Sequence, residues 1–425
     1  MPKVLFIEYK TNQTELKDYI TREMDAILRQ NYLEHIEKHL GKDTIIILTG
    51  QRRVGKSYIL RMFRDRVLAA GGSNVIYVDK EKKDFDNIKT YIDLNVHIDA
   101  HRVAGKLNYI LIDEIQDIAD FERSVRSYYE ESDVEIIITG SNSKMLSSDL
   151  STLIGGRYKE IYIQSLSYRE FMLFHQLPDS DDTLAKYIQF GGLPALARIG
   201  LDEQDVRDYQ LDVYHTVLLK NVVMRNQIRN VVFLENLVRF LADNTGKLIS
   251  ANSISKYMKA QGERVTSMAI INYARYLCDA YVIHKVSRYD IHGKRLFETN
   301  DKYYFEDCGI RNALVGGICE GDIEKVIENI VYNHLVRLGY EVTVGQLQSA
   351  EIDFVCTKPA GKRLYVQVAY IVADESTRLR EFGNLRAIPD NYPKYVISLT
   401  PLLTKTDDNG ITHLHLRKFL VDGLN

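Results

Sequence analysis

The segment Gly50–Ser57, GQRRVGKS, has the residue types and spacing that hold a phosphate chain. It fits the pattern G-x-x-x-x-G-K-[ST], in which the glycines permit positive φ angles and a close approach of the backbone. The amide N–H groups of such a loop can point at a β-phosphate. Lys56 is then expected to reach the β- and γ-phosphates, and Ser57 to ligate Mg²⁺. The motif therefore predicts ATP and Mg²⁺ as cofactors.

The residues on either side of this loop supply the context that the motif requires. Thr44–Leu48, TIIIL, reads as a buried strand that ends at the loop, and the amphipathic stretch SYILRMFRDRVLAAGG follows as a helix stopped by Gly71 and Gly72. A chance match is the alternative, and the strand–loop–helix order argues against it. The expected nucleotide-binding residues, with one from the lid described below, are Gly50, Gln51, Arg52, Arg53, Val54, Gly55, Lys56, Ser57, Tyr58 and Pro194.

A run of aliphatic residues that ends in two acids, YILIDEIQD, spans Tyr109–Asp117. In an open α/β sheet, a carboxylate at the carboxyl end of a strand lies beside the phosphate loop. Asp113 is expected to hold Mg²⁺, mostly through water, and Glu114 to orient and deprotonate the attacking water. An acidic turn without function is the alternative. Together with the phosphate loop, the pair predicts an ATPase that forms ADP and phosphate.

Two further segments supply candidates for contact with the γ-phosphate. The strand VEIIITGSN, Val134–Asn142, ends in Ser141 and Asn142, either of which could sense the phosphate, and Asn142 is taken as the catalytic candidate. In LIGGRYKEI, Arg157 follows two glycines, where an arginine could neutralise γ-phosphate charge in its own subunit or in a neighbour. A surface arginine paired with an acid is the alternative. If Arg157 acts on the nucleotide of a neighbouring subunit, the protein would be a homo-oligomer.

The order of the elements around these motifs predicts the fold. Ser73–Asp79 and Tyr158–Ile163 read as two more strands, and helical stretches separate all five. Such alternation predicts an α/β fold with a parallel sheet that is covered on both faces. A further strand is expected between the acidic strand and the strand of the phosphate loop, because a catalytic glutamate follows the metal-binding aspartate.

The region after the sheet reads as a helical lid. Arg169–Asn230 is helical in pattern and is interrupted by GGLP, Gly191–Pro194. Proline with two glycines breaks a helix and offers an apolar edge, so that Pro194 could cover the adenine. A simple turn between helices is the alternative.

Three short helical stretches and an extended segment follow, which is the order of a winged helix-turn-helix. His292 and Gly293 lie at the tip of a predicted hairpin, and Ser250 and Thr266 stand where helix caps belong. From Gly246 to Leu296, nine lysines and arginines face three acids, a local net charge of +6 in a chain of net charge -3. This basic module makes DNA a candidate partner. A module for contact with protein is the alternative.

The last segment reads as helix, three strands, helix and strand, the order of restriction-type nucleases. Such enzymes hold Mg²⁺ and activate water with two acids followed by Glu-x-Lys. Glu328 and Asp353 stand at the first two positions, but Gln367 and Ala369 replace the glutamate and the lysine. With Gln367 a metal would lose a charged ligand, and with Ala369 the water would lose the group that activates it. Nuclease activity is therefore not expected. Asp374 or Glu375 standing in is the alternative.

The full set of motifs resembles a large prokaryotic family of AAA-type ATPases, close to the archaeal ATPase and STAND groups, fused to a C-terminal nuclease-like domain of unknown function. GQRRVGKS, YILIDEIQD, IIITGSN, GGRY and GGLP carry the ATPase part, and AEIDFV, YVQVAY and YPKYVISL carry the C-terminal part. The resemblance covers nearly the whole chain from about Tyr19 onward. It implies an AAA+ fold, ATP binding by the residues named above, and Arg157 as a candidate arginine finger.

With 425 residues, the chain exceeds the size at which one hydrophobic core stops growing. The expected parts are an N-terminal extension (1–18), a P-loop ATPase core (19–165), a helical lid (166–230), a winged helix-turn-helix (231–307) and a nuclease-like α/β domain (308–425). No stretch is apolar enough for a membrane span, and four scattered cysteines indicate neither a zinc site nor disulfides, which favours the cytoplasm.

The predicted function is an ATP-driven molecular switch that acts on nucleic acid. ATP and Mg²⁺ would bind between the sheet and the lid, and hydrolysis would reorient the winged helix and the terminal domain. Two alternatives remain: a regulator that uses ATP to grip a partner protein, and an active Mg²⁺-dependent nuclease.

Overall fold

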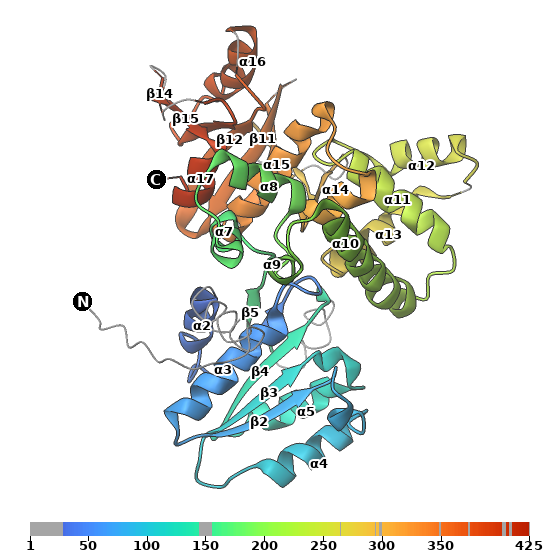
Figure 1. Cartoon of the computed structure of the whole chain (residues 1–425), viewed down its shortest axis with the longest axis vertical. Coiled ribbons are helices and arrows are strands. Elements are labelled where there is room, and N and C mark those ends of the chain that lie inside the picture. The colour runs from blue at the N-terminus through green and yellow to red at the C-terminus, as the bar shows by residue number, and fades with distance from the viewer. Residues whose placement is uncertain are drawn as a thin grey trace.

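The computed structural model describes residues 29–424, except 144–154, 264, 294, 297–299, 348–349, 373–374, 402–404 and 408–409. The extension predicted at residues 1–18 lies outside these ranges. A five-stranded sheet forms one end of the long axis, an eight-stranded sheet forms the other, and helices α10 to α13 lie to one side of the second sheet (Figure 1). Among the described residues, the helices lack the length and apolar character that a bilayer crossing requires.

The first sheet is parallel and has the strand order β2-β3-β4-β1-β5. Its strands are β1 (Ile45–Thr49), β2 (Asn74–Asp79), β3 (Asn108–Asp113), β4 (Val134–Gly140) and β5 (Tyr158–Tyr162). The predicted inserted strand is β4, which lies between the acidic strand β3 and the phosphate-loop strand β1. The helices of this part are α2 (Gln30–Glu37), α3 (Lys56–Ala70), α4 (Tyr91–His101) and α5 (Phe121–Tyr129), with short 3₁₀ turns η1 (Lys83–Phe85) and η2 (Ile115–Asp117).

Strand β1 shows why the sheet is covered on both faces. Successive side chains of a strand point to opposite faces, and all five residues of β1 are buried. Ile45 and Ile47 belong to the hydrophobic cluster formed with α4 and α5. Ile46 and Leu48 belong to the cluster formed with α2 and α3. A continuous aliphatic run is therefore what this position requires, as the sequence predicted.

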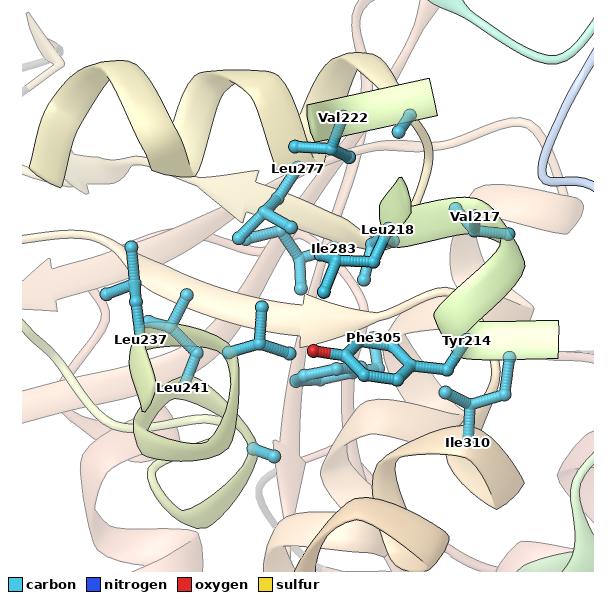
Figure 2. Close-up of a cluster of buried hydrophobic side chains, with 14 of the residues drawn as sticks. Tyr214, Val217, Leu218, Val222, Leu237, Leu241, Leu277, Ile283, Phe305 and Ile310 are labelled. Carbon is cyan, nitrogen blue, oxygen red and sulfur yellow. The ribbon is translucent and has the colours of Figure 1, made fainter. Parts of the chain in front are cut away.

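A helical body follows the first sheet. Its helices are α7 (Tyr168–His175), α8 (Asp181–Phe190), α9 (Leu196–Ile199), α10 (Glu203–Val217), the π-helical turn η4 (Leu218–Met224), α11 (Val231–Asp243), α12 (Ala251–Ala260), α13 (Ser267–Asp279) and α14 (Cys308–Val315). The predicted caps are present: Ser250 accepts from the amide of Ser253, and Thr266 from that of Ala269. Figure 2 shows part of the core, where Tyr214 and Leu218 lie near Ile283 and Phe305.

The hairpin predicted around His292 and Gly293 forms, but it joins a different sheet from the one expected. Strand β6 (Ile283–Val286) pairs with β9 (Lys302–Phe305) beside the three helices, whereas β7 (Arg288–Asp290) and β8 (Arg295–Leu296) extend the C-terminal sheet through β10. Ile291 explains the difference, because it is buried with Ile352 and Val355 of that sheet. The chain between residues 231 and 307 thus contributes strands to both sheets, and the bound predicted between residues 307 and 308 stays a prediction.

The C-terminal sheet has the order β14-β15-β13-β12-β11-β10-β7-β8. Its remaining elements are η5 (Glu320–Asp322), α15 (Ile323–Arg337), β10 (Glu341–Leu347), β11 (Ala350–Lys358), η6 (Pro359–Gly361), β12 (Lys362–Val368), α16 (Glu375–Arg386), β13 (Lys394–Ser398), β14 (Lys405–Thr406), β15 (Ile411–His415) and α17 (Leu416–Asp422). The predicted order of helix, three strands, helix and strand corresponds to α15, β10, β11, β12, α16 and β13.

Candidate nucleotide site and a second carboxylate cluster

The loop Gly50–Ser57 connects the carboxyl end of β1 to the amino end of α3, and its glycines are required where they stand. Gly50 has φ of 141°, and a Cβ atom on it would lie 2.1 Å from the carbonyl oxygen of Ile163. Gly55 has φ of 102° and precedes the first residue of α3. Both conformations favour glycine, so any side chain at Gly50 would displace the loop from β5.

Lys56 lies buried behind the loop. Its Nζ donates to the carbonyl oxygens of Gly50 at 3.1 Å and Gln51 at 2.9 Å, and lies 3.9 Å from Oε1 of Glu114. Burial lowers the pKa of Lys56, although the carboxylates of Glu114 and Asp113 oppose this. The ammonium group thus has two neutral acceptors that a more negative ligand could replace.

Asp113 ends strand β3, and its carboxylate is buried beside the loop. Oδ1 accepts from the hydroxyl of Thr139 at 2.5 Å, whereas the buried Oδ2 has no hydrogen-bond partner among the described residues. Burial raises the pKa of Asp113 to about 6, against hydrogen bonds from Thr139 and Ser57. A buried carboxylate oxygen with spare acceptor capacity, next to a serine hydroxyl, fits the oxygen ligands that Mg²⁺ prefers.

Glu114 follows with a left-handed backbone, at φ of 53°, which turns its side chain back toward Lys56. Its Oε2 accepts from the hydroxyl of Ser141 at 3.0 Å and from the side-chain amide of Gln116. Burial would raise the pKa of Glu114, but the Lys56 ammonium and these donors outweigh burial, so the pKa lies below its usual value. The carboxylate is therefore ionised at neutral pH.

Thr139 of β4 is a site residue that the sequence reasoning missed. Its hydroxyl donates to Asp113 and accepts from the backbone N–H of Glu114 at 3.0 Å, so it holds both acids in place. The inserted position of β4 makes this contact possible, because Thr139 faces the end of β3 directly. A hydroxyl two residues before Ser141 on the expected neighbouring strand was the available signal.

A cavity of about 240 Å³ opens in front of Lys56 and Glu114. Residues of the loop, of α3 and of the helical body line it together, among them Arg52, Arg53, Gly55, Ser57, Tyr58, Arg61, Phe174, Pro194, Ala195, Arg198 and Tyr209. Pro194 thus lines the cavity, and its contact with an adenine stays a prediction. Gly50, Gln51 and Val54 do not line it and instead support the loop from behind.

Arg29 also lines the cavity, and it is the second site residue, after Thr139, that no motif indicated. Its buried guanidinium donates to the carbonyl oxygens of Val54 at 3.2 Å and Gln164 at 3.4 Å, and lies 3.8 Å from Glu170. It therefore ties the phosphate loop to the start of the helical body.

Two predicted catalytic residues do not line this cavity. Asn142 is buried beyond the end of β4, and its neighbour Ser141 is the residue that contacts Glu114. Arg157 is exposed, and its carbonyl oxygen accepts from the amide of Ile45 at the amino end of β1. The phosphate loop follows the opposite end of that five-residue strand, about 15 Å away. The geometry gives Arg157 no contact with the phosphate loop of its own chain.

The C-terminal carboxylates form a second cluster around a buried lysine. Nζ of Lys302, from β9, lies 2.7 Å from Oε1 of Glu328, 2.7 Å from Oε1 of Glu351 and 3.4 Å from Oδ1 of Asp353. Burial alone would lower the pKa of Lys302, but the three carboxylates raise it well above its usual value. Tyr304 also donates to Glu328, at 2.5 Å.

The two substituted positions lie beside this cluster. Gln367 accepts from the amide of Asp353 at 3.4 Å, and Ala369 is buried at the end of β12. Asp374 lies outside the described residues, as does the side chain of Glu375. The ammonium of Lys302 fills the space that a cation bound by Glu328 and Asp353 would need.

Comparison with known families agrees with this architecture. A family model described as an AAA domain matches residues 42–172, and one described as a domain of unknown function (DUF8612) matches residues 181–318. An uncharacterized protein of Haemophilus influenzae is 32% identical over 402 residues, which cover 93% of this chain and 98% of that protein. The chain belongs to this family of AAA-domain proteins. A protein of Methanocaldococcus jannaschii is 26% identical over 367 residues, covering 81% and 79%.

Solved structures share the fold only distantly with this AAA-domain protein. The Aeropyrum pernix ORC1 protein in complex with DNA matches with a TM-score of 0.33 at 12% identity, covering 68% of this chain and 92% of that one. DnaA of Aquifex aeolicus bound to AMPPCP matches with a TM-score of 0.30 at 14% identity, covering 59% and 87%. TM-scores this low support no inference about function.

Proposed function

We propose that this AAA-domain protein binds and hydrolyses ATP, and that the nucleotide state sets the position of the helical body. The supporting observation is the buried group of Lys56, Asp113 and Glu114 at the carboxyl ends of β1 and β3, in front of a cavity that the helical body closes. Pro194 and Tyr209 of the helical body line the same cavity as the phosphate loop. Loss of the γ-phosphate would therefore change the contacts of both the loop and the helical body.

Each residue has a role in the hydrolysis that follows from its position. Lys56 exchanges the carbonyl oxygens of Gly50 and Gln51 for the β- and γ-phosphates. The ionised carboxylate of Glu114 takes a proton from the water as that water attacks the γ-phosphorus, and ADP leaves. Ser141 keeps the carboxylate oriented during this transfer.

The residues beside Lys56 suit a magnesium ion bound with the nucleotide. Asp113 would hold it through water and Ser57 through its hydroxyl. Bound there, Mg²⁺ would neutralise charge on the β- and γ-phosphates. Thr139 keeps Asp113 aimed at this position by its 2.5 Å hydrogen bond.

The test is a turnover assay on the purified full chain. We expect phosphate release from MgATP, loss of both nucleotide binding and release with Lys56→Ala, and loss of release alone with Glu114→Gln. Lys159→Ala is the matched control, because Lys159 is exposed on the edge strand β5. Turnover that survives both site substitutions would exclude these roles.

Nucleic acid is the target that we propose for the switch. Lys256 and Lys259 of α12 and Arg275 of α13 are exposed, which suits a winged helix-turn-helix that contacts the phosphate backbone. Met268 and Ile271 are 64% and 52% exposed on α13, and this apolar pair favours the alternative of a protein partner.

A titration with duplex DNA at increasing salt separates these alternatives. Contacts to phosphates give an affinity that falls steeply with salt, and Lys256→Ala with Arg275→Ala should reduce that slope. The pair Met268→Ser and Ile271→Ser is the matched control and should leave the slope unchanged. No binding at low salt would favour the protein partner.

We propose that the C-terminal domain, although nuclease-like in its order of elements, has no nuclease activity. The ammonium of Lys302 already neutralises Glu328 and Asp353, and Gln367 supplies no third charge.

If Arg157 acts as a finger, it does so on a neighbouring subunit, since it lies far from its own phosphate loop. Arg157→Ala should then lower turnover without weakening nucleotide binding, and restoration by an Arg157-intact, Lys56→Ala partner would show action between subunits.

A further inference from the structure

The π-helical turn η4, Leu218–Met224, continues helix α10 and reaches back to the first sheet. Asn221 is buried on this turn. Its Nδ2 donates to the carbonyl oxygen of Ser141 at 3.2 Å and to the hydroxyl oxygen of Ser141 at 3.1 Å. Because a carbonyl oxygen can only accept, the amide nitrogen must face Ser141.

The hydrogen bonds continue from Ser141 to the proposed catalytic base. Ser141 has one hydroxyl proton, and its hydroxyl donates to Oε2 of Glu114 at 3.0 Å. The hydroxyl oxygen is then available to accept from Asn221. The three side chains form a directed chain, Asn221 to Ser141 to Glu114, in which each bond polarises the next.

The other side of the turn is fixed in the helical body. Leu218 and Val222 belong to the same hydrophobic cluster as Leu277 of α13 and Ile283 of β6 (Figure 2). Helix α13 also packs directly on η4. A movement of α13 therefore displaces η4, and through it the donor to Ser141.

A π-helical turn is suited to such a displacement. Single π-turns within α-helices are uncommon and recur at functional sites, because the extra residue spoils regular hydrogen bonding. Reversion to α-helical bonding would rotate Asn221 relative to β4. The hydrophobic contacts of Leu218 and Val222 make this turn respond to the body that carries them.

We propose that Asn221 is a positioning residue that makes ATP hydrolysis depend on the position of helix α13, which packs against η4. This inference rests on the proposed ATPase activity and deepens it by naming the route of regulation. With Asn221 on Ser141, Glu114 is held toward its water. With η4 displaced, Ser141 is free to turn away and hydrolysis slows while nucleotide stays bound.

The experiment measures kcat, KM and nucleotide Kd for Asn221→Ala, Ser141→Ala and the double variant. We expect Asn221→Ala to lower kcat by up to about tenfold, the upper end of the effect of one hydrogen bond between neutral groups, with Kd unchanged. Because the two residues act in series, the double variant should be no slower than Ser141→Ala alone.

Two further variants make the result decisive. Leu219→Ala changes an exposed side chain of the same turn and should leave kcat unchanged. Asn221→Asp keeps the volume but cannot donate, and it replaces Asn221→Ala should that variant fail to fold. Three results would overturn the coupling: an unchanged kcat in Asn221→Ala, a loss of nucleotide affinity as large as the loss of kcat, or a double variant whose loss of kcat is the product of the two single losses. Absence of turnover in the unaltered chain would instead remove the proposed ATPase activity itself.

Discussion

Two buried lysines, Lys56 at the phosphate loop and Lys302 on β9, lie beside carboxylates in separate parts of the molecule, and their pKa values are shifted in opposite directions. Burial lowers the pKa of Lys56, whereas three close carboxylates raise that of Lys302. Lys56 donates to two neutral carbonyl oxygens and lies 3.9 Å from its nearest acid. Lys302 lies within 2.7 Å of two acids.

The partners of the two ammonium groups show that the Lys56 site can accept an anionic ligand, whereas the charge of Lys302 is already balanced by carboxylates. An ammonium with only neutral acceptors at hydrogen-bond distance gains when a phosphate replaces them. An ammonium already surrounded by carboxylates gains nothing from a new ligand, and it keeps a second cation out. The same residue types thus form a site suited to the proposed nucleotide in one part of the chain and a closed ion cluster in the other.

The largest effect is expected from Lys302→Met. Removing the ammonium leaves Glu328, Glu351 and Asp353 close together without a counter-charge, which should lower the free energy of unfolding by about 3–5 kcal/mol. Urea unfolding measures this loss. Added Mn²⁺ should recover part of it in the variant and none in the unaltered chain. Lys186→Met is the matched control, because Lys186 pairs with the exposed Asp182 on α8 and should cost less than about 1 kcal/mol.

Lys56→Met is the same change at the other lysine, with the opposite result. Nucleotide affinity should fall about 100-fold through loss of charge-assisted hydrogen bonds, while the free energy of unfolding changes by less than about 1 kcal/mol. Calorimetry with MgATP and a urea titration measure the two quantities. A stability loss as large as that of Lys302→Met would contradict the contrast between the sites.

The pKa directions predict a difference in chemical reactivity. Lowering the pKa of Lys56 increases its neutral, nucleophilic fraction at any pH below 10.5, and raising that of Lys302 decreases its fraction. Reductive methylation at pH 9 should therefore label Lys56 before Lys302, and ATP should protect Lys56. Peptide mass spectrometry reads both positions. Labelling of Lys302 first in the folded chain would refute the assignment.

The smallest effect is expected from Gln367→Glu. This change restores a carboxylate beside Asp353, yet the ammonium of Lys302 still occupies the space between the acids. Mn²⁺ binding, measured by calorimetry or electron paramagnetic resonance, should remain undetected in the single variant and should appear when Lys302→Met is added. Metal binding by Gln367→Glu alone would show that Lys302 does not exclude a cation.

The grouping of the phosphate loop with two acids in the candidate nucleotide site was predictable because its signals are local. The phosphate loop and the pair Asp113 and Glu114 each lie within a few residues at the end of an aliphatic strand, and the parallel sheet brings the strand ends together. Arg157 could have been placed by the same rule. It directly precedes a parallel strand, so it must lie at the amino edge of the sheet, opposite the phosphate loop.

The contacts that were missed join distant parts of the chain. Asn221 lies 80 residues from Ser141, and Lys302 lies 51 residues from Asp353. Neither contact has a periodic pattern that the sequence could show. The hairpin around His292 has a clear local signal, but nothing local says which of two sheets it will join.

The path of the chain between β6 and α14 has a practical consequence. The hairpin β7–β8 is hydrogen-bonded to β10, and α14 packs against α8, α10 and α11, so strands and helices are exchanged across residue 307. A fragment ending at that residue would leave an unpaired hairpin and expose the surface that α14 covers. Proteolysis is therefore expected to release no stable half from this region, and expression should succeed only with both halves together.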